Sequence, residues 1–249
     1  MEMLNKKDLP STEVRHSDEL ELEGVIEEAR EWLRGKQAHE GYWAFELEAD
    51  ATISAEYIFL NHFLGTLDNG IEEKLANYLR KIQGKHGGWP LYYDGDFNIS
   101  ASVKAYYALK MVGDNPDAPH MVRARKAILA EGGAAKANVF TRITLALFEQ
   151  LPWRAVPVIR IEALLLPKWA LFHVDKVSYW SRTVMIPLFI LAALKPTAVN
   201  PRRVNITELF LKPAEKEMNY MVNPTGNWRG AAFLFIDRTI RPFEGVIPT

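Results

Sequence analysis

Cysteine is absent from all 249 residues of this chain. Its absence excludes disulfide bonds, thiolate metal ligands and a cysteine nucleophile, and it fits a reducing compartment. Long apolar runs are also missing, because the longest extends only from Thr183 to Leu194 and contains Pro187. That run is too short to cross a bilayer. We therefore predict no transmembrane helix and interpret the run as a buried, kinked core helix.

An excess of charge of one sign is missing as well. The 30 basic and 31 acidic residues are interspersed and give a net charge of −1. The chain thus lacks the basic patch of a nucleic-acid-binding protein, and no nucleic-acid partner is predicted. From Met1 to about Glu19, charged and polar residues alternate without an apolar segment. No signal peptide is predicted, and residues 1–20 are interpreted as an N-terminal arm.

Histidine pairs with the spacing of metal ligands are missing too. The six histidines are His16, His39, His62, His86, His120 and His173. None of them has another histidine four residues away, which is the spacing that places two imidazoles on one face of a helix. The sequence therefore predicts no metal site.

What the chain does contain is apolar periodicity typical of helices. Its hydrophobic content of 48% and charged content of 24% describe a globular chain that can bury a sizeable core. Strand signals are almost absent, so the predicted fold class is all-α. Apolar positions at helical spacing predict two helices, at 22–33 and 71–82, and further helices at about 51–65, 98–112, 118–130, 139–150, 160–166, 177–194 and 231–240.

One phrase, Q-x3-G-x-W, occurs twice at an interval of 46 residues. Its members are Gln37, Gly41 and Trp43 in the first copy and Gln83, Gly87 and Trp89 in the second. A period of this size is typical of stacked helical pairs. At a helix end, the glycine can adopt a left-handed conformation, the carboxamide can bond orphaned backbone groups, and the indole can lie flat against that amide. We interpret both copies as structural motifs, each of which would hold one helix against the start of the next.

The two phrases resemble the QW motifs of class II triterpene cyclases, and their surroundings are similar to bacterial squalene-hopene cyclases over nearly the whole chain. The similar segments include Glu46 to Ile53, Asp96 to Tyr106, Val139 to Arg142, Pro152 to Pro157 and Ser178 to Arg182. The resemblance implies an α/α barrel, a toroid of repeated helical hairpins, which is incomplete relative to the two-barrel cyclase. Residues 21–249 would be the inserted N-terminal barrel domain, truncated at its C-terminal end.

The family's reaction, which the resemblance implies, is the cationic cyclisation of squalene to hopene or hopanol. A carboxylic acid protonates the terminal alkene, and aromatic faces stabilise the successive carbocations. This chemistry suits those groups, because a weakly basic alkene needs a desolvated, strong acid, and a cation in a dry cavity is held by the faces of aromatic rings. The resemblance implies no metal and no other cofactor.

The chain departs from the family at the proton donor. The D-x-D-D motif of the family is absent. The nearest phrase, Asp94 to Phe97, matches only the first half of that motif, and we expect it to lie in an exposed glycine turn. No catalytic residue is therefore predicted here, and we expect the chain alone to be inactive. The implied partners are squalene or a related isoprenoid and the missing C-terminal half. The full-length family also implies a homodimer and peripheral attachment to the cytoplasmic side of the bacterial inner membrane.

Four side chains are carried over from the family as candidate site residues. Trp180 aligns with an aromatic residue of the substrate cavity, and Glu56 aligns with a glutamate near the cavity wall. Val177 and Met185 align with positions at the substrate entrance. For each residue a structural alternative stays open: core packing for Trp180, Val177 and Met185, and a hydrogen-bonded buried carboxylate for Glu56.

Other functions fit the residues less well. The β subunits of protein prenyltransferases and thioester domains need a cysteine, and class I terpene synthases need a D-D-x-x-D motif, which this chain lacks. Glu46, Glu48 and Asp50 could be glycosidase carboxylates on an α/α barrel, although solvated or helix-capping acids explain them more simply. A stand-alone helical-repeat domain that binds a protein or an isoprenoid lipid without catalysis remains the alternative to a cyclase part.

Overall fold

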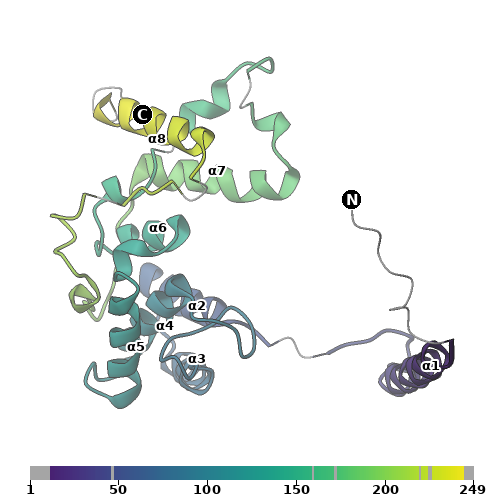
Figure 1. Ribbon diagram of the computed structural model, residues 1–249. Coiled ribbons are helices and arrows are strands. Elements are labelled where there is room, and N and C mark those ends of the chain that lie inside the picture. The colour runs from purple at the N-terminus through teal and green to yellow at the C-terminus, as the bar shows by residue number, and fades with distance from the viewer. Residues whose placement is uncertain are drawn as a thin grey trace, which may run out of the picture. The chain divides into compact units, whose positions relative to one another are not determined.

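The computed structural model describes residues 12–45, 48–158, 160–170, 173–218, 220–223 and 226–243. These residues form helices and connecting segments without a β-strand, so the all-α prediction is confirmed (Figure 1). The chain divides into two compact units, Met1–Glu48 and Ala49–Thr249.

The first unit is built around helix α1, Thr12–Gly35. This helix begins inside the segment 1–20 that the sequence predicts to be an arm, and residues 1–11 lie outside the described part. The division into an arm and a domain at residue 20 therefore stays a prediction. After α1 the chain turns back, and the ring of Phe45 stacks on that of Trp32 with a centroid distance of 5.8 Å.

The second unit contains seven α-helices among its described residues. They are α2 (Ala51–Leu64), α3 (Asn69–Lys81), α4 (Ile99–Val112), α5 (Pro119–Ala130), α6 (Val139–Leu147), α7 (Tyr179–Leu194) and α8 (Trp228–Ile240). Short 3-10 helices lie between them: η1 (Ala134–Lys136), η2 (Trp153–Ala155), η3 (Ile161–Leu165), η4 (Val174–Lys176) and η5 (Thr207–Leu209), with η6 (Arg241–Phe243) after α8.

Polar side chains determine where most of these helices begin. At the start of six of them, a side-chain oxygen of the N-cap residue accepts a hydrogen bond from a backbone N–H of the first turn. These N-cap residues are Asp50, Asp68, Asn98, Asn138, Ser178 and Asn227. Such a cap satisfies one of the orphaned donors of the first turn. The repeat is not exact here, because Asp50 caps α2 whereas Asn98, rather than Asp96, caps α4.

Besides α1, which begins ten residues before the predicted 22–33, three predicted helices of the second unit differ from the observed ones in type or by three residues at one end. The segment predicted at 160–166 is the 3-10 helix η3, because Arg160 offers no side-chain cap and Pro167 follows closely. The helix predicted at 139–150 ends at Leu147, before Glu149 turns to a positive φ of 59°. Helix α8 begins at Trp228 rather than 231, since Asn227 caps it.

The core of the second unit is centred on α4, which lies among α2, α3 and α5 (Figure 1). Every residue from Ser100 to Leu109 is buried. The rings of Phe59, Tyr107 and Phe148 form a cluster with centroid distances of 5.4 to 5.7 Å, which joins α2, α4 and the end of α6. Burial of aromatic rings of this size contributes much of the hydrophobic stabilisation.

Within the described ranges, none of the helices combines the length and the apolar character needed to cross a membrane.

Candidate functional site

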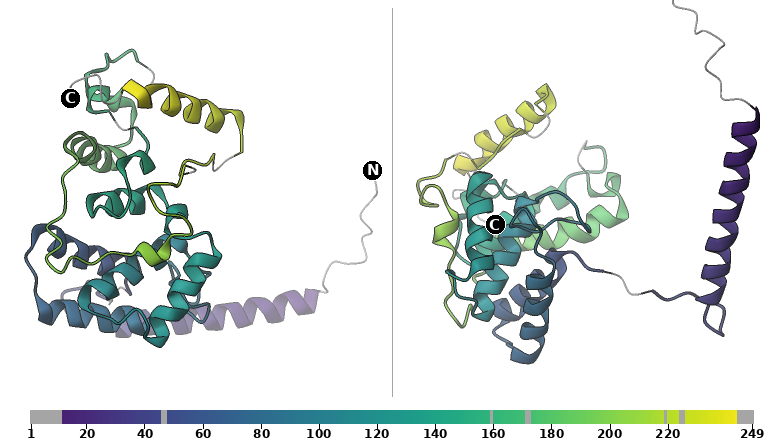
Figure 2. Two further views of the ribbon diagram at one scale, coloured as in Figure 1. Left: turned by 90° about the vertical axis from the view of Figure 1, so that its left-hand side faces the viewer. Right: turned by 60° about the horizontal axis from the view of Figure 1, so that its bottom comes forward.

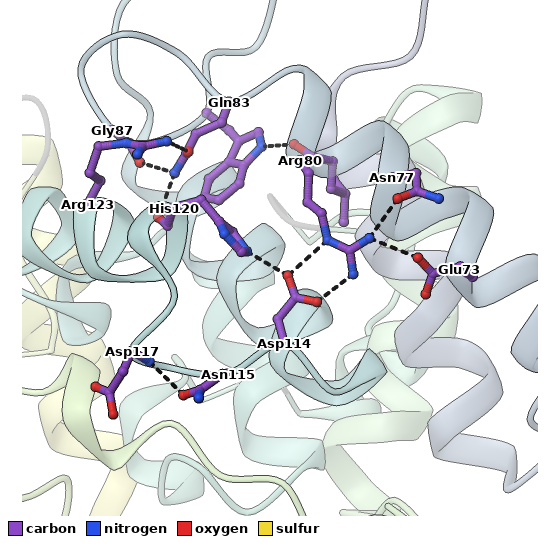
Figure 3. A network of polar contacts seen from close by, with 12 residues as sticks. Glu73, Asn77, Arg80, Gln83, Gly87, Asp114, Asn115, Asp117, His120 and Arg123 are labelled. Atoms are coloured by element: carbon purple, nitrogen blue, oxygen red, sulfur yellow. Dashed lines mark hydrogen bonds and ion pairs between the residues drawn. The ribbon is translucent and has the colours of Figure 1, made fainter.

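The second QW phrase joins the end of α3 to the beginning of α5 (Figure 3). The Gln83 side chain donates from Nε2 to the carbonyl oxygens of Gly87, at 2.7 Å, and His120, at 2.9 Å. Its Oε1 accepts a hydrogen bond from Nη2 of Arg123 at 2.8 Å. Gly87 has a φ of 90°, and a Cβ there would lie 3.0 Å from the Arg123 carbonyl oxygen, so the turn requires glycine.

The indole of the second phrase is buried. Trp89 is 0% exposed, and its Nε1 donates to the carbonyl oxygen of Leu79 at 2.8 Å. Its backbone N–H donates to Oγ of Ser102 on α4 at 2.8 Å. Trp89 therefore fixes the outer helix α3 to the central helix α4.

An ion-pair network extends from the same region (Figure 3). Arg80 forms a bidentate pair with Asp114, at 3.1 and 2.5 Å, and also bonds Glu73 and Asn77. The His120 Nε2 atom lies 2.6 Å from Oδ2 of Asp114. Burial by itself would raise the pKa of Asp114, but the hydrogen bonds from Arg80 and His120 outweigh it and hold the pKa below its ordinary value.

The first QW phrase has the same internal geometry in the first unit. The Gln37 Nε2 atom donates to the Gly41 carbonyl oxygen at 2.7 Å, and Nε1 of Trp43 donates to the Leu33 carbonyl oxygen at 2.7 Å. Gly41 has a φ of 88°. Trp43, however, is 48% exposed.

Glu56 lies on α2 and forms an ion pair with Lys104 of α4. The Lys104 side chain is buried, whereas the Glu56 side chain is half exposed. The structure therefore does not support the alternative of a buried structural carboxylate. Glu56 is part of an exposed stripe on α2 whose apolar members are Ile53, Tyr57, Leu60 and Leu64.

Trp180 lies in the first turn of α7 and is 78% exposed. Its ring meets that of Tyr179 edge to face, at 6.0 Å. Trp180 is therefore no core residue within the described part of the chain, while Val177 and Met185 are partly buried. Exposed large apolar side chains also include Val184, Ile186, Ile190 and Leu194 on α7 and Phe233, Phe235, Ile236 and Ile240 on α8. The prediction of a buried core helix at 183–194 is therefore wrong for this structure, where Phe189 is the buried residue of α7. Among the described residues, Trp180 and Glu56 share no hydrogen bond, ion pair or ring contact.

The described residues of the acidic phrases lie in an exposed segment and at a helix start. Asp94 and Asp96 are exposed in a turn, where the Gly95 N–H donates to the Tyr92 carbonyl oxygen at 3.1 Å. Asp50 caps α2 through a 2.7 Å bond from the Thr52 N–H, which supports its interpretation as a helix cap. Glu46 lies outside the described residues. No group of three or more potential metal ligands occurs in the described ranges.

A buried ionic cluster was not predicted from the sequence. Nε2 of His62 lies 2.9 Å from Oε1 of Glu72, and the other Glu72 oxygen lies 2.8 Å from Nη1 of Arg202. The side chains of His62 and Glu72 are 0% and 1% exposed. No local pattern could reveal this cluster, because Arg202 is remote in sequence from α2 and α3.

Comparison with known proteins places the whole second unit, and part of the first, in one family. The family model for the squalene-hopene cyclase N-terminal domain matches residues 26–249. A squalene-hopene cyclase of Schizosaccharomyces japonicus is 52% identical over 230 residues, which cover 92% of this chain and 35% of that protein. A squalene-hopene cyclase of Bradyrhizobium diazoefficiens is 55% identical over 213 residues, covering 85% of this chain and 32% of that protein.

A third relative is named for a different product. The dammaradiene synthase of Dryopteris crassirhizoma is 32% identical over 229 residues, which cover 91% of this chain and 33% of that protein. The chain thus spans about a third of the length of these curated relatives.

Proposed function

Because this chain belongs to the squalene-hopene cyclase family and matches its N-terminal domain, we propose that it supplies that domain in the cationic cyclisation of squalene to hopene or hopanol. The sequence contains no D-x-D-D motif. The proposal therefore assigns the protonating acid to the region of the relatives that this chain does not cover. The chain by itself binds no cofactor and performs no cyclisation in this proposal.

The exposed apolar side chains of α7 are the observation that carries the proposal. Proteins seldom expose extensive apolar surface without a binding role, and α7 exposes Trp180 and Val184 on one side and Ile186 and Ile190 on another. An apolar wall with an indole face suits a polyene that acquires positive charge, since the indole ring attracts a cation through its quadrupole. We assign Trp180 to the substrate cavity, and Val177 and Met185 to its entrance.

Glu56 has a different part in the proposal. Its carboxylate lies on the exposed, mostly apolar stripe of α2 and is paired with the Lys104 ammonium group. An ion-paired carboxylate is an electrostatic partner for a nearby cation and is unsuited to protonating an alkene. We assign Glu56 to the cavity wall as an electrostatic group.

The assembled enzyme would have the partners that the family implies. These are squalene or a related isoprenoid, the C-terminal part of the cyclase, a second copy of the enzyme and the surface of the cytoplasmic membrane. The alternative, a stand-alone repeat domain that binds a protein or lipid without catalysis, is less favoured because the family match is specific to cyclases.

Complementation tests the proposal directly. The chain is coexpressed with the part of the Bradyrhizobium diazoefficiens relative that lies beyond the matched region, and squalene-derived products are measured by gas chromatography and mass spectrometry. We expect hopene from the coexpressed pair and none from either part alone. Hopene from this chain alone would contradict the assignment of the acid, and an isolated complex without any cyclised product would contradict the proposed function.

The role of Trp180 is tested in the active pair. Trp180→Ala should shift the products toward prematurely terminated polycycles, because a late cation loses its aromatic support. Trp180→Phe should keep most of the wild-type product ratio, and Trp169→Ala, which removes another exposed indole, should leave that ratio unchanged. An unaltered product ratio in Trp180→Ala would refute the cavity role of this residue.

A further inference from the structure

The chain after α7 returns to the ends of earlier helices before it leads into α8, as the light green segment of Figure 2 shows. We call residues 198–206 the crossing segment. The Ala198 N–H donates to the carbonyl oxygen of Leu147 in the last turn of α6, at 2.9 Å. The N–H groups of Val199 and Asn200 donate to the carbonyl oxygens of Phe63 and His62 near the end of α2, at 3.1 and 3.0 Å. The crossing segment thus satisfies carbonyl groups that a helix end leaves without partners.

Arg202 connects the crossing segment to two further helices. Its Nη1 donates to the carbonyl oxygen of Met111 at the end of α4, at 2.6 Å, and its Nη2 donates to Oδ1 of Asn69 at the start of α3, at 2.7 Å. Nη1 also lies 2.8 Å from Oε2 of the buried Glu72. A cation is favourable at the C-terminal end of α4, because the helix dipole is negative there.

His62 shares the Glu72 carboxylate with Arg202. With a neutral imidazole the cluster contains one carboxylate and one guanidinium, so its charges balance. The His62 and Glu72 side chains are buried, whereas the Arg202 side chain is 30% exposed. A proton on the buried His62 would add a second cation beside a single carboxylate, which is costly. Burial lowers the pKa of His62, the Arg202 charge lowers it further, and Glu72 opposes both. Glu72 and Arg202 are the two charged groups that act on His62 among the described residues.

We propose that the His62–Glu72–Arg202 cluster is an acid-sensitive latch, which holds the crossing segment on the helix ends when His62 is neutral and loosens it when His62 is protonated. This inference is independent of the proposed catalytic function. The pH dependence of the latch follows from the difference between the proton affinities of the latched and released His62. The released His62, with an ordinary pKa of 6.5, binds a proton more tightly than the latched one does, so the stability that this histidine contributes is complete above that pH and declines below it.

Amide hydrogen exchange on the 249-residue chain tests the latch. Exchange of the Val199 and Asn200 amides is measured between pH 5 and 8 and corrected for the intrinsic pH dependence of exchange. We expect the opening equilibrium of these amides to increase about tenfold per pH unit below 6.5, until His62 is also protonated in the latched state. The Gly133 amide, which donates to the Ile128 carbonyl oxygen, should show no such dependence. Equal loss of protection at Gly133 would indicate global unfolding and contradict a local latch.

Three variants complete the test. His62→Gln should abolish the pH dependence at Val199 and Asn200, whereas His39→Gln, at an exposed histidine, should preserve it. Arg202→Met should reduce protection at every pH and should weaken the pH dependence, because burial still disfavours the protonated His62 but the repulsion from Arg202 is gone. An unchanged pH response in His62→Gln, or in Arg202→Met if the first variant does not fold, would overturn the proposal.

Discussion

The two QW copies have the same local structure and different surroundings. In both, the glutamine carboxamide bonds the carbonyl oxygen of the glycine four residues later, at 2.7 Å. In both, the indole N–H bonds a carbonyl oxygen ten residues earlier in the preceding helix, at 2.7 and 2.8 Å. The glycines have φ values of 88° and 90°. The phrase therefore encodes a turn that closes on its own helix.

The difference lies beyond the turn. Trp89 is completely buried, whereas Trp43 is about half exposed. Gln83 also bonds the His120 carbonyl oxygen and Arg123, but the Gln37 side chain makes no second hydrogen bond among the described residues of its unit. The phrase therefore specifies a backbone conformation, while its contribution to the stability of the fold depends on which residues pack against it.

Replacement of the tryptophans should separate the two copies most strongly. Trp89→Ala should lower the free energy of unfolding by roughly 3–5 kcal/mol, because it leaves a large cavity and an unbonded Leu79 carbonyl oxygen. Trp43→Ala should cost about 1 kcal/mol, since much of its ring is already exposed. Urea unfolding followed by circular dichroism measures both. Equal losses would mean that burial does not distinguish the copies.

Replacement of the glycines separates backbone strain from steric clash. Both positions have positive φ, so an alanine costs roughly 1–2 kcal/mol at either one. At Gly87 a Cβ also lies 3.0 Å from the Arg123 carbonyl oxygen, whereas at Gly41 the nearest atom, Nε2 of Gln37, is 4.0 Å away. Gly87→Ala should therefore cost about 1 kcal/mol more than Gly41→Ala.

The matched reporters for this pair are two amides in the turns themselves. The Ala38 N–H donates to the Tyr42 carbonyl oxygen at 2.9 Å, and the Gly84 N–H donates to the Gly88 carbonyl oxygen at 2.8 Å. Hydrogen exchange at each amide reports the stability of its own turn. If Gly41→Ala reduced the protection of the Ala38 amide more than Gly87→Ala reduced that of the Gly84 amide, the predicted order of the two costs would be wrong.

Features that depend on nearby residues were the ones that the sequence predicted. Helix α2 was expected at 51–65 and occupies Ala51–Leu64, because Asp50 caps its start and Gly65, with a φ of 73°, ends it. Helix α4 was expected at 98–112 and occupies Ile99–Val112, where Asn98 caps its start and Gly113, with a φ of 118°, ends it. Caps and glycine ends act within a few residues, so a single sequence displays them.

Pairings between remote side chains were not predicted. Nothing near Glu56 indicates that Lys104 pairs with it, and nothing near His62 or Glu72 indicates that Arg202 completes their cluster. These pairs require the helices to be assembled first. The site roles of Trp180, Glu56, Val177 and Met185 came from the family resemblance, and they stay predictions.

Replacement of the glutamines should give the smallest difference between the copies. Gln83→Ala removes three hydrogen bonds and leaves two carbonyl oxygens without this partner, so we expect a loss of about 1–2 kcal/mol. Gln37→Ala removes one exposed bond and should cost about 0.5 kcal/mol. A double-mutant cycle with Arg123→Met sharpens the result, because groups in direct contact are not additive. If Arg123→Met costs as much in the Gln83→Ala background as in the wild type, the contact between Gln83 and Arg123 contributes no coupling energy to the second copy.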